Sequence, residues 1–235
     1  MSDINLKEYQ FNPAHPFSEN GKRYLAYLLA GERRTALKFI NELVAEGVPL
    51  KTIYLEIFQR AQWELGFLWE TNQISVAEEH YCTAATQMIM AQLYPHFLIG
   101  ERKGHVAVIA SVGGELHEIG ARMVSDFLEM DGWDTYYIGA NTPADSLIEL
   151  IKNKKPDVVG LSVTMSFHIP ELKALIERIY QEVEIERNAL KIVVGGRPFN
   201  VAEDLWKKLG DVDGYGKNLE SAVELVNQLV SEEKV

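Results

Sequence analysis

The spacing of apolar residues changes near Gly104, and this change constrains the fold more than any other feature. Between about Ser18 and Leu98 the apolar residues recur at steps of three and four, which is typical of helices. After Gly104, short β-rich runs alternate with amphipathic helices, as in a parallel sheet with helices on both faces. We therefore expect a helical domain over residues 1–103 and an α/β domain over residues 104–235. A chain of 235 residues with 47% hydrophobic content can supply both cores.

Four helices are predicted in the first half, near residues 22–29, 33–44, 50–72 and 76–95. Ser75 with Glu78 three residues on fits a capping box at the start of the last helix. The short connections indicate antiparallel neighbours in a four-helix bundle.

Five strands are predicted in the second half, at residues 105–111, 135–138, 157–163, 191–194 and 214–215. This number fits a flavodoxin-like (Rossmann-like) parallel sheet. Ligands of such sheets bind beyond the carboxyl ends of the strands, where the strand order reverses. We therefore expect the functional residues to follow the strands.

The first predicted strand is followed by Gly-Gly-Glu-Leu-His-Glu-Ile-Gly, residues 113–120. A neutral imidazole such as that of His117 is a good donor to a transition metal, and Glu115 is placed to hold its other N–H. The alternative is that His117 only caps the next helix. Two further strand ends support a ligand site at this edge. Ser162 and Thr164 end the third strand, and Gly195-Gly196 end the fourth. Taken singly, each of these would be an ordinary strand end or turn.

Together these residues resemble the cobalamin-binding fold of methionine synthase, the mutases and the corrinoid methyl carriers. The matching segments are Glu115-Leu116-His117-Glu118-Ile119-Gly120, Ser162-Val163-Thr164, Gly195-Gly196 and Tyr215-Gly216. The resemblance implies that His117 ligates cobalt from below in place of the dimethylbenzimidazole base. The displaced base and its nucleotide tail would enter a groove beside Ser162, Thr164, Gly195 and Gly196. Most members of the family have aspartate where this chain has Glu115.

The helical half is similar to the cap that covers the upper corrin face in this family. Trp69, followed after nine residues by Glu79-His80, resembles the adenosylcobalamin-dependent photoreceptors, in which these residues surround the adenosyl group. The alternative is that Trp69 is core packing and Glu79-His80 a solvated helix face. The photoreceptors usually have histidine where Glu70 stands, and a DNA-binding domain that we expect this chain to lack.

Composition excludes several other functions. A formal charge of 23 − 34 = −11 and the lack of a basic helix argue against nucleic-acid binding. Neither a signal peptide nor a membrane-spanning run is visible, and the single cysteine, Cys82, cannot form an internal disulfide, so we expect a cytoplasmic protein. His117-Glu118 lacks the second histidine of a zinc protease, since Ala121 stands there. We interpret His168 as a residue that leads into a helix.

The leading hypothesis is a cobalamin light sensor, with adenosylcobalamin as the favoured form, in which photolysis of the cobalt–carbon bond moves the cap. A bilin such as biliverdin is a candidate second chromophore, as in the related photocobilin type. The alternative is a corrinoid methyl carrier for a methyltransferase, and a plain cobalamin-binding module is a third interpretation. In each case we expect a carrier or sensor module more than an enzyme, acting as a homo-oligomer or with a protein effector.

Overall fold

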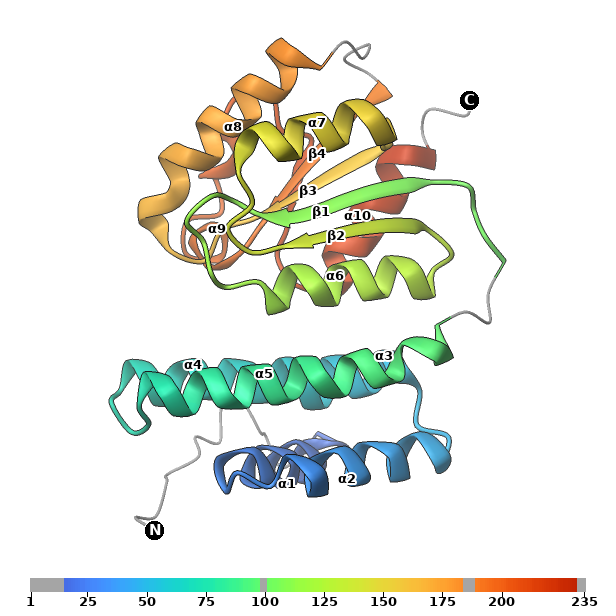
Figure 1. Ribbon diagram of the computed structural model, residues 1–235, viewed down its shortest axis with the longest axis vertical. Coiled ribbons are helices and arrows are strands. Elements are labelled where there is room, and N and C mark those ends of the chain that lie inside the picture. Colours follow the sequence, from blue (N-terminus) through green and yellow to red (C-terminus); the bar gives the residue numbers. More distant parts are fainter. Residues whose placement is uncertain (1–14, 98–100, 184–188, 232–235) are drawn as a thin grey trace. The chain divides into compact units, whose positions relative to one another are not determined.

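The protein consists of two compact units that divide after Pro95. The computed structural model describes residues 15–97, 101–183 and 189–231. The first unit is helical and the second is a five-stranded parallel sheet with helices on both faces, as predicted (Figure 1). Within the described residues, no helix is long and apolar enough to cross a membrane.

The helical unit contains the four predicted helices. They are α1 (Ser18–Leu29), α2 (Arg33–Ala45), a long helix made of α3 (Leu50–Thr52), a π-helical stretch (Ile53–Gln59) and α4 (Arg60–Glu70), and α5 (Val76–Leu93). The π-helical stretch was not predicted. Its buried residues Ile53 and Ile57, like Tyr54 and Phe58, recur every four positions, so their spacing is indistinguishable from that of an α-helix.

The predicted capping box at the start of α5 is present. The Ser75 hydroxyl oxygen accepts a hydrogen bond from the Glu78 backbone N–H at 3.2 Å, and the Glu78 carboxylate accepts one from the Ser75 N–H at 2.7 Å. Both donors would otherwise lack a partner in the first turn of the helix, so the pair fixes where α5 begins.

The α/β unit contains the five predicted strands. They are β1 (Val106–Ser111), β2 (Asp134–Gly139), β3 (Val158–Ser162), β4 (Lys191–Gly195) and β5 (Gly214–Gly216). All pairings are parallel and the order is β2-β1-β3-β4-β5, which confirms the flavodoxin-like arrangement.

Helices cover both faces of this sheet (Figure 1). One face carries α6 (Ile119–Met130) and α10 (Leu219–Ser231), and the other carries α7 (Ala144–Lys154) and α8 (Ile169–Glu182). The short α9 (Arg197–Val201) follows β4. Apolar residues of β1, β3 and β4 form a continuous core with α7 and α8.

The strand order determines which loops meet at the carboxyl edge of the sheet. The chain passes from β1 outward to β2 and then returns to β3 on the other side of β1, so this is the point where the strand order reverses. The strand ends are in register, with Ser111 opposite Ser162 and Ser162 opposite Gly195. The loop after β1 therefore lies between the loops after β2 and β3.

Candidate functional site

The loop between β1 and α6 holds a histidine and a buried carboxylate in direct contact. His117 Nδ1 lies 2.5 Å from Glu115 Oε1. The Glu115 side chain is 1% exposed, whereas the His117 side chain is 46% exposed. The carboxylate therefore belongs to the fold, and the imidazole reaches the surface at the carboxyl edge of the sheet.

The surrounding hydrogen bonds keep Glu115 ionised. Its Oε2 accepts hydrogen bonds from the backbone N–H groups of Thr164 at 2.8 Å and Met165 at 2.9 Å. Burial acts to raise the pKa of Glu115, but the hydrogen bonds from His117, Met165 and Thr164 outweigh it and lower that pKa to about 2.

The ionised carboxylate fixes the tautomer of His117. A carboxylate can only accept hydrogen bonds, so His117 Nδ1 must carry the hydrogen in this contact. In the neutral imidazole the lone pair is then on Nε2, which is the state that ligates a metal. The longer side chain of glutamate reaches the imidazole where the family usually has aspartate.

His117 is not a helix cap. The residue at the N-cap position of α6 is Glu118, and no side chain caps this helix end, whose residues are all described. The loop that carries His117 is instead joined to the loop after β2 by two hydrogen bonds. Asn141, after β2, accepts a hydrogen bond from the Gly114 N–H with its Oδ1 at 2.9 Å and donates its own N–H to the Glu115 carbonyl at 3.0 Å.

A single histidine donor, His117, fits a metal whose other ligands come from a macrocycle. Among the described residues, no group of three or more histidine, cysteine, aspartate or glutamate side chains could hold a metal ion. A metal at His117 would therefore need its remaining ligands from elsewhere, as the ring nitrogens of a corrin supply them. Leu116 and Phe167, 69% and 67% exposed, provide apolar surface in this loop and in the loop after β3. The exposure of Phe167 could not be predicted from the sequence, because it depends on the fold.

The two glycines at the end of β4, Gly195 and Gly196, have different roles. Gly196 has φ +116°, and a Cβ there would lie 1.8 Å from the Val163 carbonyl oxygen, so only glycine fits. A Cβ on Gly195 would meet only the Gly216 carbonyl oxygen, at 3.7 Å, among the described atoms. The backbone next to Ser162 is therefore open at Gly195 and closely packed at Gly196.

The remaining predicted site residues of the α/β unit differ in burial and in contacts. Val163 is fully buried, whereas Ser162, Thr164 and Tyr215 are half-buried. Glu118 accepts the Ala140 N–H at 2.8 Å, and Ile119 and Gly120 form the first turn of α6. At Gly216 a Cβ would lie 2.5 Å from the Ala222 Cβ, so this glycine lets α10 approach β5.

The helical unit holds the other three predicted site residues. Trp69, in the last turn of α4, is 37% exposed and so is not core packing. Glu79 lies between two partners in the first turns of α5, with its Oε2 2.6 Å from His80 Nδ1 and its Oε1 accepting from the Thr83 hydroxyl at 2.8 Å. The His80 side chain is 70% exposed.

A chain of hydrogen bonds runs from Glu79 through Thr83 into the core of the helical unit. The sequence pattern did not predict this chain. Thr83 contacts Gln62 Oε1 at 2.8 Å, and Gln62 Nε2 donates to the Thr86 hydroxyl at 3.1 Å. Thr86 also accepts from the buried Tyr24 hydroxyl at 3.0 Å. Glu79 is thus positioned by residues on three helices.

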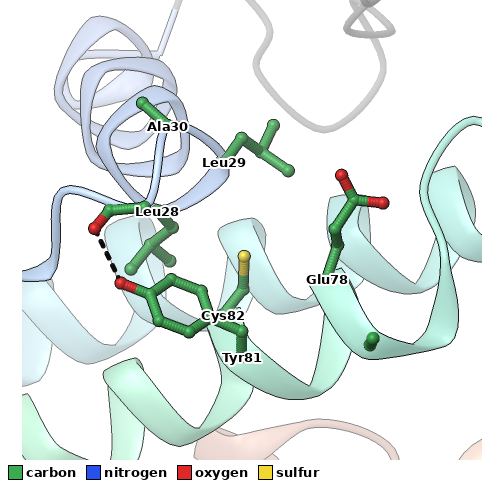
Figure 2. Close-up of a pocket in the computed structure, with 8 residues that line it drawn as sticks. Leu28, Leu29, Ala30, Glu78, Tyr81 and Cys82 are labelled. Carbon is green, nitrogen blue, oxygen red and sulfur yellow. Dashed lines mark hydrogen bonds between the residues drawn. The ribbon is translucent and has the colours of Figure 1, made fainter.

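A pocket of about 380 Å³ lies elsewhere in the helical unit (Figure 2). It is lined by Leu28, Leu29, Ala30, Gly31, Ala77, Glu78, Tyr81 and Cys82. The Tyr81 hydroxyl donates to the Gly31 carbonyl at 2.8 Å and closes one side. None of the predicted cofactor residues lines this pocket, so we place the candidate site at the edge of the sheet.

Comparison with known proteins links both units to cobalamin. Residues 105–224 match a family described as B12 binding domain, and residues 21–94 match a second family of the same description. Dimethylamine corrinoid protein 3 of Methanosarcina acetivorans is 31% identical over 86% of this chain and 93% of its own length. Dimethylamine corrinoid protein 1 of the same organism is 28% identical over 72% and 78%.

A solved structure shows the same fold. The monomethylamine corrinoid protein of Methanosarcina barkeri superposes with a TM-score of 0.78 at 19% identity and covers 91% of this chain and 99% of its own. The names of these relatives agree with the methyl-carrier alternative better than with light sensing. The chain belongs to the family of corrinoid proteins with B12-binding domains.

Proposed function

We propose that this chain binds cobalamin with His117 as the lower axial ligand and carries a methyl group for a cobalamin-dependent methyltransferase. The observation that carries the proposal is the Glu115–His117 contact at the carboxyl edge of the sheet, in a chain related to methylamine corrinoid proteins. Bound cobalamin supplies a cobalt centre that accepts and releases a methyl group. The protein supplies the axial ligand, its orientation and a partner surface.

Each residue of the edge has a separate task in this proposal. Glu115 holds the His117 imidazole in one tautomer and one orientation. Leu116 and Phe167 offer apolar surface to a flat ring. Gly195, where a Cβ would meet only one described atom, would contact the displaced nucleotide tail together with Ser162 and Thr164.

Transfer of a labelled methyl group tests the proposal. The protein, loaded with cobalamin and reduced, is incubated with ¹³C-methyl-labelled mono-, di- or trimethylamine and a methylamine:corrinoid methyltransferase. We expect labelled methylcobalamin on the protein, and no labelling when the methyltransferase is omitted. Bound cobalamin that is never methylated by any of the three amines would contradict methyl carriage from methylamines.

A second candidate function, cobalamin light sensing, is favoured by one specific observation. Trp69 is partly exposed and Glu79 is fixed by Thr83, as a pocket around an upper ligand would require. The test is the absorption spectrum and sedimentation of the adenosylcobalamin-loaded protein before and after green light. A change of assembly on illumination that is lost in Trp69→Ala would favour the sensor over the carrier.

The state of the Cys82 thiol determines whether a bilin could be attached there covalently. Burial, followed by the nearby carboxylates of Glu79 and Glu78, raises the pKa of the Cys82 thiol to about 12. The thiolate that covalent bilin attachment needs is therefore disfavoured. We therefore expect a copurified bilin to be held without a covalent bond to Cys82.

A further inference from the structure

The imidazole of His168 lies against the loop that carries His117. We propose that His168 is a positioning residue that fixes this loop, and with it the orientation of His117 towards cobalt. The inference rests on the proposed binding of cobalamin at His117, but its first test uses the cobalamin-free protein.

The contact between His168 and Gly114 is close. Gly114 has φ +79°, and a Cβ there would lie 2.8 Å from His168 Cε1, 3.3 Å from Nδ1 and 3.7 Å from Nε2. The ring therefore occupies the space that a side chain at position 114 would need. The next residue along the loop is Glu115, which holds His117.

The segment that carries His168 also binds Glu115. The backbone N–H groups of Thr164 and Met165 donate to Glu115 Oε2, and the His168 N–H donates to the Met165 carbonyl at 3.0 Å. One short turn after β3 thus contacts the His117 loop at two successive residues. The amides hold the Glu115 carboxylate, and the ring holds the backbone at Gly114.

His168 is itself fixed by its position at the start of a packed helix. It is the N-cap residue of α8, followed by Pro170 in the first turn. Leu172 and Leu175 of the same helix are buried in the core of the sheet. The Phe167 ring packs against the imidazole in a tilted arrangement, with centroids 4.3 Å apart and an interplanar angle of 56°. The backbone of His168 is therefore held by a packed helix, and the Phe167 ring lies on one side of the imidazole.

The ring adds to the backbone hydrogen bonds that restrain Gly114. The Gly114 N–H donates to Asn141, and the Glu115 N–H closes the turn onto the Val112 carbonyl at 3.0 Å, but neither bond fills the space beside the Gly114 Cα as the ring does. Without the His168 ring, Gly114 gains conformational freedom, and the Glu115–His117 contact beside it loosens. We expect His168→Ala to lower the His117-bound fraction of cobalamin several-fold while total cobalamin binding is retained through the tail groove.

The first test follows the His117 Nδ1 proton by NMR in the cobalamin-free protein. The charge-assisted hydrogen bond from His117 Nδ1 to the buried Glu115 carboxylate predicts a downfield proton resonance, which is assigned by its loss in His117→Ala. We expect His168→Ala to shift or broaden this resonance and His168→Phe, which keeps a flat ring, to retain most of it. An unchanged resonance in His168→Ala would overturn the proposal.

A stability cycle tests the contact itself. Gly114→Ala suffers both backbone strain and the clash with His168, so it should cost less stability in the His168→Ala background than in the wild type. The matched control is Gly210→Ala, which has φ +97° and no described atom within 4 Å of its Cβ, and should be additive with His168→Ala. Additive behaviour of Gly114→Ala would also overturn the proposal.

The cobalamin-loaded protein separates this inference from the proposed function. If the wild type binds cobalamin through His117 and His168→Ala does so equally, the positioning role fails and the proposed function stands. If the wild type binds no cobalamin, the proposed function fails. The NMR and stability results then still show whether the His168 ring restrains Gly114 and the Glu115–His117 contact.

Discussion

The Glu115 carboxylate connects two neighbouring loops of the sheet through its two oxygens. One oxygen lies 2.5 Å from His117 Nδ1, and the other accepts the N–H groups of Thr164 and Met165. A single buried side chain therefore orients the proposed axial ligand and joins the loops after β1 and β3. Several measurable consequences depend on this carboxylate.

Replacement of Glu115 by glutamine should weaken the binding of His117 to cobalt. A neutral amide has one acceptor oxygen for the four described N–H partners, so the imidazole loses its fixed orientation. Removal of such an orienting partner typically lowers metal affinity by about 10- to 100-fold. We expect a fall of this size in the equilibrium between His117-bound and unbound cobalt, measured by absorption spectroscopy.

The control for this experiment is Glu118→Gln. Glu118 is a neighbouring carboxylate that also accepts a backbone N–H, but its partner is Ala140, in the loop after β2. The Glu118→Gln substitution should leave the fraction of cobalamin that is bound through His117 close to that of the wild type. Equal effects of the two substitutions would mean that general loop damage, and not loss of the Glu115 contact, explains the result.

The lowered pKa of Glu115 predicts a defined loss of stability in acid. The pKa falls from 4.5 to about 2 on folding, because hydrogen bonds to the charged form outweigh the cost of burial. At about 1.4 kcal/mol per pKa unit, this shift corresponds to roughly 3 kcal/mol of stability. That stability is present above pH 4.5 and is lost as the pH falls towards 2.

Denaturation of the cobalamin-free protein over this pH range provides the measurement. Other carboxylates titrate in the same window, so the relevant quantity is the difference between the wild type and Glu115→Gln. We expect this difference to shrink as the pH falls from 5 towards 2, by roughly 3 kcal/mol in total. A difference that stays constant over the range would show that Glu115 is not held in its charged form.

Gly196→Ala should destabilise the α/β unit severely. The substitution combines unfavourable positive φ with a Cβ placed 1.8 Å from the Val163 carbonyl oxygen. Gly210→Ala, with φ +97° and open space among the described atoms, should cost only about 1 kcal/mol from backbone strain. Urea denaturation should show Gly196→Ala losing several times as much, and similar losses in both variants would refute the close packing.

Cys82 should react slowly with thiol reagents in the folded protein. It is 1% exposed and its pKa is raised to about 12, so little reactive thiolate reaches solvent at neutral pH. Because the chain has a single cysteine, the reaction with a chromogenic disulfide reports this residue alone. We expect complete reaction only after unfolding, whereas rapid reaction of the native protein would revive covalent bilin attachment.

Much of the fold was predictable because it depends on the local periodicity of apolar residues and on residues that mark the ends of helices and strands. The change of period at Gly104, the capping box at Ser75 and the glycines after β4 each act over a few residues. The Glu115–His117 pair was predictable for the same reason, since the two residues are separated by one position. That the two side chains can meet follows from this spacing, whereas the position of the pair also depends on the Thr164 and Met165 amides.

The unpredicted features depend on neighbours that are distant in the sequence. The amides that hold Glu115 and the His168 ring over Gly114 come from the loop after β3, some 50 residues away along the chain. The preference for light sensing relied on three residues of the helical unit, Trp69, Glu79 and His80. The relatives, matched over most of the chain, favour methyl carriage instead.

The most direct test of the account is electron paramagnetic resonance of the cob(II)alamin-loaded protein, prepared once normally and once with ¹⁵N-labelled histidine. If His117 ligates cobalt, the triplet splitting from the axial nitrogen becomes a doublet in the labelled protein, and His117→Ala loses this response. A triplet that persists in the labelled protein would show that the dimethylbenzimidazole base remains on cobalt, and it would contradict the central role assigned to His117.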